Sequence, residues 1–94
     1  MDHGRNMNTF YYTYVLQSET TGKFYKGYTS DLRKRFKEHT KGKSTYTKDR
    51  GPYKLIYYEA CLTKEDALKR ELYLKTGRGT RFIKERLKRF LFRT

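Results

Sequence analysis

Two aromatic-rich segments on either side of a turn-like cluster constrain the fold of this chain more than any other feature. Residues 10–16 and 24–29 are rich in aromatic and β-branched side chains, a composition that favours β-strands. Residues 19–23, between them, form a cluster of turn-favouring residues around a glycine. The pattern predicts a β-hairpin.

A helix and a third strand are predicted after the hairpin. Ser30 is a candidate N-cap, and Leu32 and Phe36 supply apolar positions one helical turn apart. Gly42 ends this helix. A polar, basic loop follows, and residues 53–61 then return to a strand-like pattern.

Two further helices complete the predicted fold. Thr63 begins the first of them, the run 77–79 (Gly-Arg-Gly) ends it, and Thr80 can cap the next. In the last helix, Ile83 and Leu87 lie on one apolar stripe that can cover the sheet. The resulting order, β-β-α-β-α-α, predicts an α+β fold in which three helices flank a small three-stranded antiparallel sheet.

The length of the chain sets its predicted domain organisation. A chain of 94 residues is long enough for one compact domain and too short for two independent cores. We assign that domain to residues 10–92 and interpret residues 1–9 as a disordered leader, because they lack hydrophobic periodicity. The sequence contains no apolar run of about 18 residues, so we expect a soluble, cytoplasmic, nucleoid-associated protein.

The chain is strongly basic, with 23 Lys and Arg residues against 10 Asp and Glu residues and a formal net charge of +13. Such a surface favours a polyanionic partner, because each neutralised phosphate releases condensed counterions. Nucleic acid is therefore the leading candidate, with DNA ahead of RNA, and an anionic membrane surface is the weaker alternative. A solvated cationic face without a partner is the structural alternative to both.

Cysteine chemistry is not expected to contribute to function. Cys61 is the only cysteine, which excludes an internal disulfide and a cysteine-based zinc cluster. Because neither a histidine nor a second cysteine stands beside it in the sequence, we assign Cys61 no role.

Two residues of the first predicted helix are candidates for chemistry. Arg35 and His39 are four positions apart, so they lie on one helical face beside the apolar stripe. In a purely structural role, Arg35 extends from the edge of the stripe and His39 covers the core. In a functional role, Arg35 binds a phosphate and His39 carries a proton.

Glu71 stands within the apolar face of the second predicted helix. Its neighbours on that face include Ala67 and Leu74. A lone buried charge is costly, so this carboxylate needs a compensating cation. Lys75, one turn further on, and a bound Mg²⁺ are the two candidates, and the sequence leaves the choice between them open.

Taken together, these residues resemble the GIY-YIG nuclease family over about residues 10 to 90. Four short motifs in the family's order carry the resemblance. They are Tyr12-Thr13-Tyr14, Tyr25-Lys26-Gly27, the helix set Leu32, Arg35 and His39, and the pair Ala67 and Glu71. The compact length and the basic loop are similar to small stand-alone bacterial members, whose relatives include homing and excision-repair nucleases.

The resemblance implies a Mg²⁺-dependent (or Mn²⁺-dependent) endonuclease that hydrolyses DNA, including structured or damaged DNA. It implies that Glu71 holds one divalent ion and that Arg35 stabilises the charge of the transition state. It further implies that a hairpin tyrosine orients or deprotonates the attacking water, with Tyr14 the first choice and Tyr25 or His39 assisting. The chain departs from the family pattern in its first motif, which lacks Gly and Ile, and at Lys26 and Tyr28.

Nucleic-acid contacts are predicted outside these catalytic positions. The hairpin tyrosines either pack in the sheet or surround a phosphate, and the basic loop carries Tyr46 as a ring for base stacking. The last helix adds a basic run over residues 84–89. The predicted contact residues are Tyr12, Lys26, Tyr28, Lys43, Lys48 and Arg50.

Two alternatives to the nuclease remain open. Many family members have an asparagine near the site, whereas the only asparagines here are Asn6 and Asn8, which precede the predicted fold. A nucleic-acid-binding module without turnover is therefore the main alternative. Assembly with another protein through an exposed sheet edge is the second, and the sequence leaves the oligomeric state open.

Overall fold

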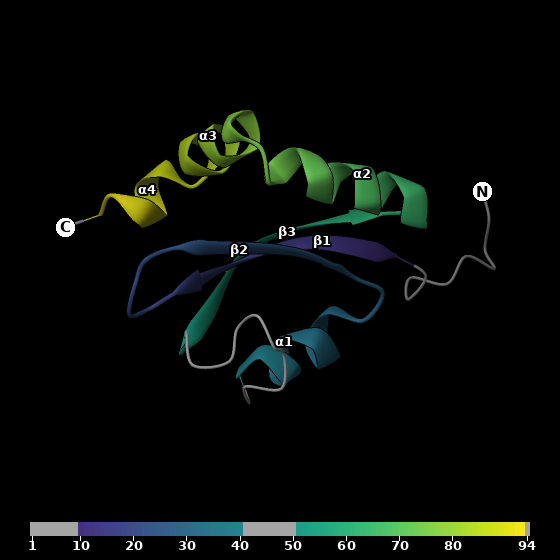
Figure 1. Cartoon of the computed structure of the whole chain (residues 1–94), viewed down its shortest axis with the longest axis horizontal. Helices are drawn as coiled ribbons and strands as arrows, with labels where there is room; N and C mark the ends of the chain where they lie inside the picture. Colours follow the sequence, from purple (N-terminus) through teal and green to yellow (C-terminus); the bar gives the residue numbers. More distant parts are fainter. Residues whose placement is uncertain (1–9, 41–50, 94) are drawn as a thin grey trace.

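Antiparallel strands form the centre of the structure, a computed structural model that describes residues 10–40 and 51–93 (Figure 1). The strands are β1 (Tyr11–Ser18), β2 (Phe24–Thr29) and β3 (Tyr53–Cys61). Their order within the described sheet is β2-β1-β3, so β1 is central and β2 and β3 are its edges. The predicted hairpin and the predicted third strand are confirmed.

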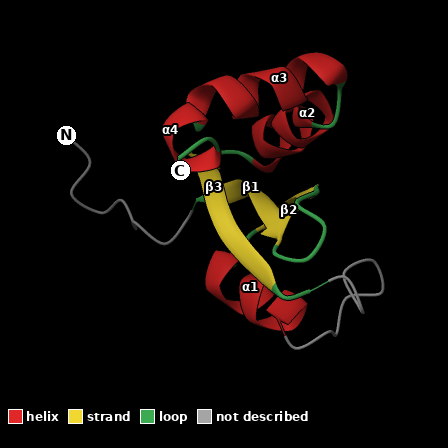
Figure 2. Cartoon of the chain, turned by 90° about the vertical axis from the view of Figure 1, so that its left-hand side faces the viewer, coloured by secondary structure: helices red, strands yellow, loops and turns green. Residues whose placement is uncertain are grey.

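Helices cover both faces of this sheet. The helix α1 (Leu32–Thr40) lies on one face, and α2 (Lys64–Leu74), α3 (Gly77–Arg86) and the short α4 (Lys88–Leu91) lie on the other (Figures 1 and 2). The predicted α+β order is confirmed with one difference, because the last predicted helix divides at Leu87 into α3 and α4. No helix in the described ranges has the length and apolar character needed to cross a membrane.

Side chains that alternate along β1 divide the core into two layers. Tyr14 and Leu16 are buried with Tyr53 on the face toward α1, where Leu32 and Phe36 pack against them. Val15 is buried on the opposite face, in a second cluster that includes buried side chains from α2 and α3. Because successive strand residues point to opposite faces, one central strand supports both layers.

Two of the predicted helix caps are wrong. The N-terminal hydrogen bond of α1 is made by Asp31, whose carboxylate accepts from the Lys34 backbone N–H at 3.1 Å, and not by Ser30. The α3 cap is Thr76, which accepts from the Gly79 N–H at 3.0 Å, and not Thr80. The predicted cap of α2 at Thr63 is confirmed.

Gly79 was expected to end a helix and instead lies buried in the first turn of α3. A Cβ atom at this position would lie 2.1 Å from the Tyr73 carbonyl oxygen and 2.4 Å from the Leu74 Cα. The backbones of α2 and α3 therefore approach more closely here than any side chain allows. The glycine sets the sharp turn between the two helices.

An ion pair between β3 and α2 fixes the second helical layer. The Arg70 Nε donates to Glu59 Oε1 at 2.9 Å and Nη2 donates to Oε2 at 3.1 Å, and the Tyr57 hydroxyl donates to the same carboxylate at 2.8 Å. The guanidinium also lies over the Tyr73 ring, 4.9 Å from its centroid, and over the Phe82 ring, 4.8 Å from its centroid. One arginine thus joins a strand to both major helices of this layer.

We expect Arg70→Met to lower the free energy of unfolding by about 1–2 kcal/mol, because a largely buried bidentate pair and its ring contacts are lost. Urea denaturation measures the change. Arg81→Met is the matched control, since Arg81 is exposed on α3 and has no ion-pair partner among the described residues. Equal stability of the two variants would show that the pair contributes nothing.

Candidate active site

The first helix brings a guanidinium and an imidazole against the tyrosines of the hairpin. The Tyr14 hydroxyl lies 3.0 Å from His39 Nε2, and Arg35 Nε donates to the same hydroxyl at 3.4 Å. The Tyr25 and His39 rings meet edge to face with their centroids 4.9 Å apart. Four residues that the sequence predicted for one site, Tyr14, Tyr25, Arg35 and His39, therefore form a contiguous cluster, named here the Arg35 cluster.

Gly27 makes room for this cluster in the sheet. It pairs with Tyr14 across β1 and β2, and a Cβ atom on it would lie 2.4 Å from the Tyr14 hydroxyl oxygen. Because glycine has no side chain, the phenol can lie across the edge strand β2 and reach α1. The glycine of the second motif is thus a steric requirement for the position of the first-motif tyrosine.

Burial sets the protonation of the Arg35 cluster. Tyr14 is 1% exposed, and its burial raises the pKa of the phenol to about 12. Burial, followed by the positive charge of Arg35, lowers the pKa of His39 to about 4. At neutral pH the phenol is protonated and the imidazole is neutral, so the Tyr14 hydroxyl accepts from Arg35 Nε and shares a second hydrogen bond with His39 Nε2, whose direction is set by the imidazole tautomer.

The guanidinium of Arg35 is the most strongly held group of the cluster. Its hydrogen bonds to Tyr14 and then Glu38 raise its pKa above the ordinary value, with Tyr25 adding a smaller hydrogen-bond contribution. Nη1 donates to Glu38 Oε1 at 2.9 Å, yet the side chain remains 33% exposed. The result is a fixed cation with one side open to solvent. Glu38 was not among the residues predicted for the site, although its i,i+3 spacing from Arg35 signals such a pair.

Because the imidazole is neutral, we expect the fold to lose stability in mild acid. In the unfolded chain His39 binds a proton below its ordinary pKa of about 6.5, whereas the native imidazole stays neutral down to about 4. The stabilisation is therefore complete above about pH 6.5 and is lost as the pH falls toward 4, by about 2–3 kcal/mol in all. Urea unfolding at a series of pH values measures this slope.

His39→Gln is the control for that slope, because an amide can either donate to or accept from the Tyr14 hydroxyl without titrating. The variant should show a clearly flatter dependence of unfolding free energy between pH 6.5 and 4.5. A slope equal to that of the wild type would assign the acid sensitivity to other groups.

Glu71 approaches the site from the other side of the sheet. It stands on α2 with its side chain 17% exposed, and Lys75 Nζ lies 3.0 Å from its Oε2 atom. Lys75, one of the two cations considered from the sequence, is thus in contact with Glu71. The negative charge of Glu71 is also the smallest of the causes that raise the pKa of Tyr14, so the two groups interact weakly through electrostatics.

The donor set at Glu71 fits a hard divalent ion that keeps most of its water. The described residues contain no group of three or more His, Cys, Asp or Glu side chains placed to bind one metal. Mg²⁺ is commonly held by one or two carboxylates together with water and phosphate oxygens, and Glu71 could supply one such carboxylate. The partner Lys75 is 51% exposed, so its ion pair with Glu71 is weak enough for a divalent ion to replace the lysine.

The predicted nucleic-acid contacts are distributed over both faces. Tyr12 lies on the face toward α1, where its ring meets the Tyr58 ring. Lys26 and Tyr28 lie on the opposite face, where Lys26 Nζ donates to Thr80 Oγ1 at 3.0 Å and the Tyr28 ring stacks on Tyr11. The loop residues of this set, Lys43, Lys48 and Arg50, together with Tyr46 and the predicted leader 1–9, lie outside the described residues.

Lys26 belongs to a basic cluster that the sequence did not reveal. Burial lowers the pKa of Lys26, and the charges of Lys84 and Lys75 lower it further. Lys26 comes from β2, Lys75 is the C-cap of α2 and Lys84 comes from α3, so only the tertiary structure places them together. Their cluster adjoins Glu71 through its ion pair with Lys75.

Comparison with known proteins agrees with the resemblance seen in the sequence. The GIY-YIG catalytic domain family matches residues 10–89. A UPF0213 protein of Bacillus pumilus is 43% identical over 67 residues, which cover 70% of this chain and 67% of the relative. A UPF0213 protein of Staphylococcus aureus is 39% identical over 80 residues, which cover 81% of this chain and 96% of the relative.

A solved structure extends this agreement to the fold. The solution NMR structure of the UPF0213 protein BH0048 from Bacillus halodurans is 35% identical, with a TM-score of 0.50 and coverage of 79% of this chain and 81% of that one. The chain therefore belongs to the GIY-YIG family of nuclease-like domains. Within that family it is similar to the bacterial UPF0213 proteins.

Proposed function

We propose that this protein is a divalent-metal-dependent endonuclease that hydrolyses phosphodiester bonds of DNA. The observation that carries the proposal is the Arg35 guanidinium, which is fixed by Tyr14 and Glu38 and still partly open to solvent. A preorganised cation of this kind stabilises the charge that grows on phosphate oxygens during hydrolysis. In the reaction, a water oxygen bonds to phosphorus and the bond to the leaving sugar oxygen breaks.

The burial of the tyrosines supports a division of roles between them. Tyr14 is 1% exposed and protonated at neutral pH, so it acts as a positioning residue that orients Arg35 and His39. Tyr25 is less buried and contacts both partners, so it is the tyrosine that orients the attacking water. This assignment favours orientation of the water by a phenol over its deprotonation by Tyr14.

Glu71 is the residue proposed to hold the metal. A divalent ion there supplies Lewis-acid stabilisation of phosphate charge when bound. β2 is an edge strand that carries Tyr25 of the Arg35 cluster and Lys26 of the basic cluster of Lys26, Lys75 and Lys84, and Glu71 pairs with Lys75 of that basic cluster. A DNA strand that passes along this edge lies near cations on both faces of the sheet. This arrangement supports a path for the DNA backbone along β2.

A binding module without turnover is the second candidate, and one observation favours it. Glu71 is paired with Lys75, so the carboxylate already has a compensating charge. In that case the lysines and Arg35 bind phosphates electrostatically, and cleavage does not occur. Nucleoid association is consistent with either candidate, because both depend on DNA affinity.

Cleavage assays on plasmid, branched DNA and RNA separate the two candidates. The wild type, Arg35→Ala and Glu71→Ala are each incubated with Mg²⁺, with Mn²⁺ and with chelator. Cleavage of DNA by the wild type alone, and only with metal, supports the nuclease. Salt-sensitive binding by all three proteins without any cleavage supports the module, and equal cleavage by all three identifies a contaminant.

A further inference from the structure

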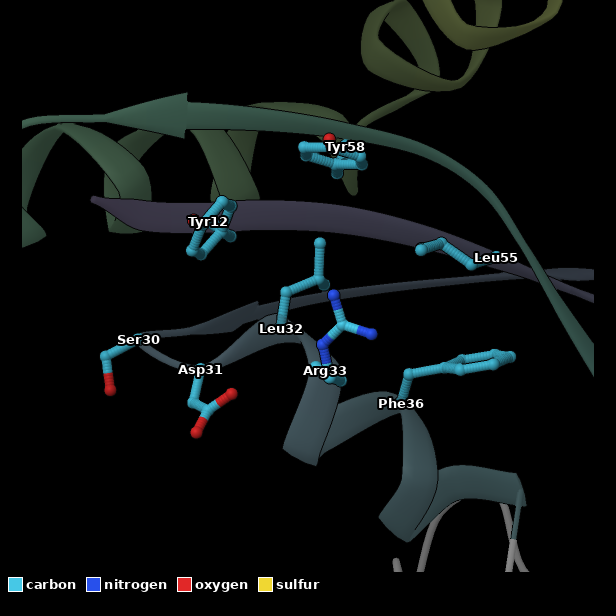
Figure 3. Close-up of a pocket in the computed structure, with 8 residues that line it drawn as sticks. All are labelled: Tyr12, Ser30, Asp31, Leu32, Arg33, Phe36, Leu55 and Tyr58. Carbon is cyan, nitrogen blue, oxygen red and sulfur yellow. The ribbon is translucent and has the colours of Figure 1, made fainter. Parts of the chain in front are cut away.

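A cleft lies on the α1 face of the sheet, separate from the Arg35 cluster. Its volume is about 640 Å³, and it opens between the start of α1 and strands β1 and β3 (Figure 3). It contains none of Tyr14, Tyr25, Arg35 and His39. Clefts of about 300–1,000 Å³ hold ligands the size of a nucleotide.

Two tyrosines form the strand side of this cleft. The rings of Tyr12 and Tyr58 meet at 65° with their centroids 5.9 Å apart, so they make an aromatic corner. Tyr58 is 53% exposed, although it stands in a strand directly opposite the buried Tyr14. A large ring so exposed beside an apolar floor of Leu32, Phe36 and Leu55 offers a flat surface to a planar ligand (Figure 3).

Two charged residues line the cleft: Asp31, whose carboxylate accepts from the Lys34 backbone N–H at 3.1 Å, and Arg33. The Arg33 guanidinium points from α1 toward the strands in Figure 3, and no described residue pairs with it. Arg33 and Arg35 are two residues apart, about 200° around a helix, so they lie on opposite flanks of the stripe of Leu32 and Phe36. One arginine therefore serves the Arg35 cluster and the other faces the cleft.

We propose that this cleft binds an unpaired base of the nucleic-acid substrate. The base stacks on the Tyr58 ring within the aromatic corner, and Arg33 contacts a phosphate beside it. This inference rests on the proposed function and narrows its substrate to DNA with an unpaired or displaced nucleotide.

The chemistry of the cleft selects this occupant over a purely apolar one. Planar rings and a free guanidinium are the combination that binds single-stranded nucleic acid, because bases stack on aromatic side chains and phosphates attract arginine. The formal net charge of +13 adds long-range attraction for the same polyanion. An apolar peptide or a neutral aromatic molecule makes no use of Arg33.

The position of the cleft relative to the Arg35 cluster also supports an unpaired base as its occupant. Tyr12 precedes Tyr14 by two residues on the same strand and the same face, so their Cα atoms are about 7 Å apart. A nucleotide held at Tyr12 and Tyr58 thus lies next to the region where the proposed reaction takes place. Holding an unpaired base there fixes the register of the neighbouring phosphodiester.

Binding measured without metal tests this inference independently of cleavage. Fluorescence anisotropy in chelator compares three labelled duplexes: fully paired, with one unpaired thymidine, and with an abasic site at the unpaired position. We expect the wild type to bind the unpaired thymidine most tightly. Tyr58→Ala should weaken that binding by about 5- to 50-fold and leave affinity for the paired duplex within about 2-fold.

Three further variants distinguish a local effect from a general one. Arg33→Gln should reduce the preference for the unpaired base about 3- to 10-fold. The matched controls are Phe92→Ala, which removes a ring 67% exposed elsewhere, and Arg81→Gln, which removes one exposed arginine of α3. Circular dichroism and thermal unfolding verify that each variant is folded.

Equal affinity of the wild type for the unpaired and abasic duplexes would overturn the inference, as would equal weakening of paired and unpaired binding by Tyr58→Ala. Failure of the proposed nuclease activity has a different signature. In that case the preference for an unpaired base and its dependence on Tyr58 persist in chelator, while Mg²⁺ produces no cleavage of any duplex.

Discussion

Glu71→Gln is expected to lower the rate of Mg²⁺-dependent DNA cleavage by about 10³-fold, because it removes the only charge proposed to hold the metal. The substitution keeps the shape of the side chain, which is 17% exposed on the sheet side of α2. It costs little stability, since the lost ion pair joins a half-exposed lysine and is worth about 1 kcal/mol or less. Single-turnover cleavage and urea unfolding measure the two effects separately.

The matched control for this variant is Glu85→Gln. Glu85 is an exposed carboxylate of α3 and carries the same charge away from the site. The Glu85→Gln variant should cleave at the wild-type rate, because Glu85 lies away from the site. The change in net charge is the same in both variants, so any difference in rate is due to Glu71. If Glu71→Gln cleaves as fast as Glu85→Gln, then Glu71 does not hold the metal and its role is confined to the pair with Lys75.

The sequence predicts the strands well because their signals are local. The aromatic and β-branched residues of 10–16 and the strand-like pattern of 53–61 are signals within a single segment, as is the turn around Gly22, with its positive φ of 77°. Each signal points to the same element as the final structure. The cap of α2 at Thr63 is predicted for the same reason.

The helix boundaries that the sequence missed depend on contacts between elements. Thr76 and Thr80 are both plausible caps, and the choice is made by the approach of α3 to α2 at Gly79, where only a glycine fits. A glycine in a sequence signals a helix end as readily as a close backbone contact. Its meaning is decided by a tertiary packing that local patterns do not contain.

In the candidate site, too, the features set by local spacing were predicted from the sequence, and those set by contacts between elements were not. The spacing of Arg35 and His39 places them on one helical face, and the hairpin register then brings Tyr14 to them across Gly27. Exposure and protonation could not be predicted, because they depend on how deeply the phenol and the imidazole are buried. This is why the expected proton acceptor Tyr14 becomes a positioning residue in the proposal.

Arg35→Lys tests the proposed role of the guanidinium while retaining its charge. A lysine ammonium cannot donate in the fixed fork that meets both Tyr14 and Glu38 and still present a donor to phosphate. We expect cleavage to fall by about 10²- to 10³-fold, the loss found when one preorganised transition-state donor is removed. DNA affinity should change by less than about 3-fold, because the net charge is unchanged.

Comparing the cleavage rate of Arg35→Lys with its DNA affinity separates a role in catalysis from a role in binding. Arg81→Lys, the equivalent change on the exposed surface of α3, should leave both quantities unaltered. A drop in cleavage without a matching drop in binding places the guanidinium at the transition state, because uniform binding would lower both together. If affinity and rate fall by the same factor in Arg35→Lys, the arginine is a docking residue, and the charge developed during hydrolysis must be stabilised by another group.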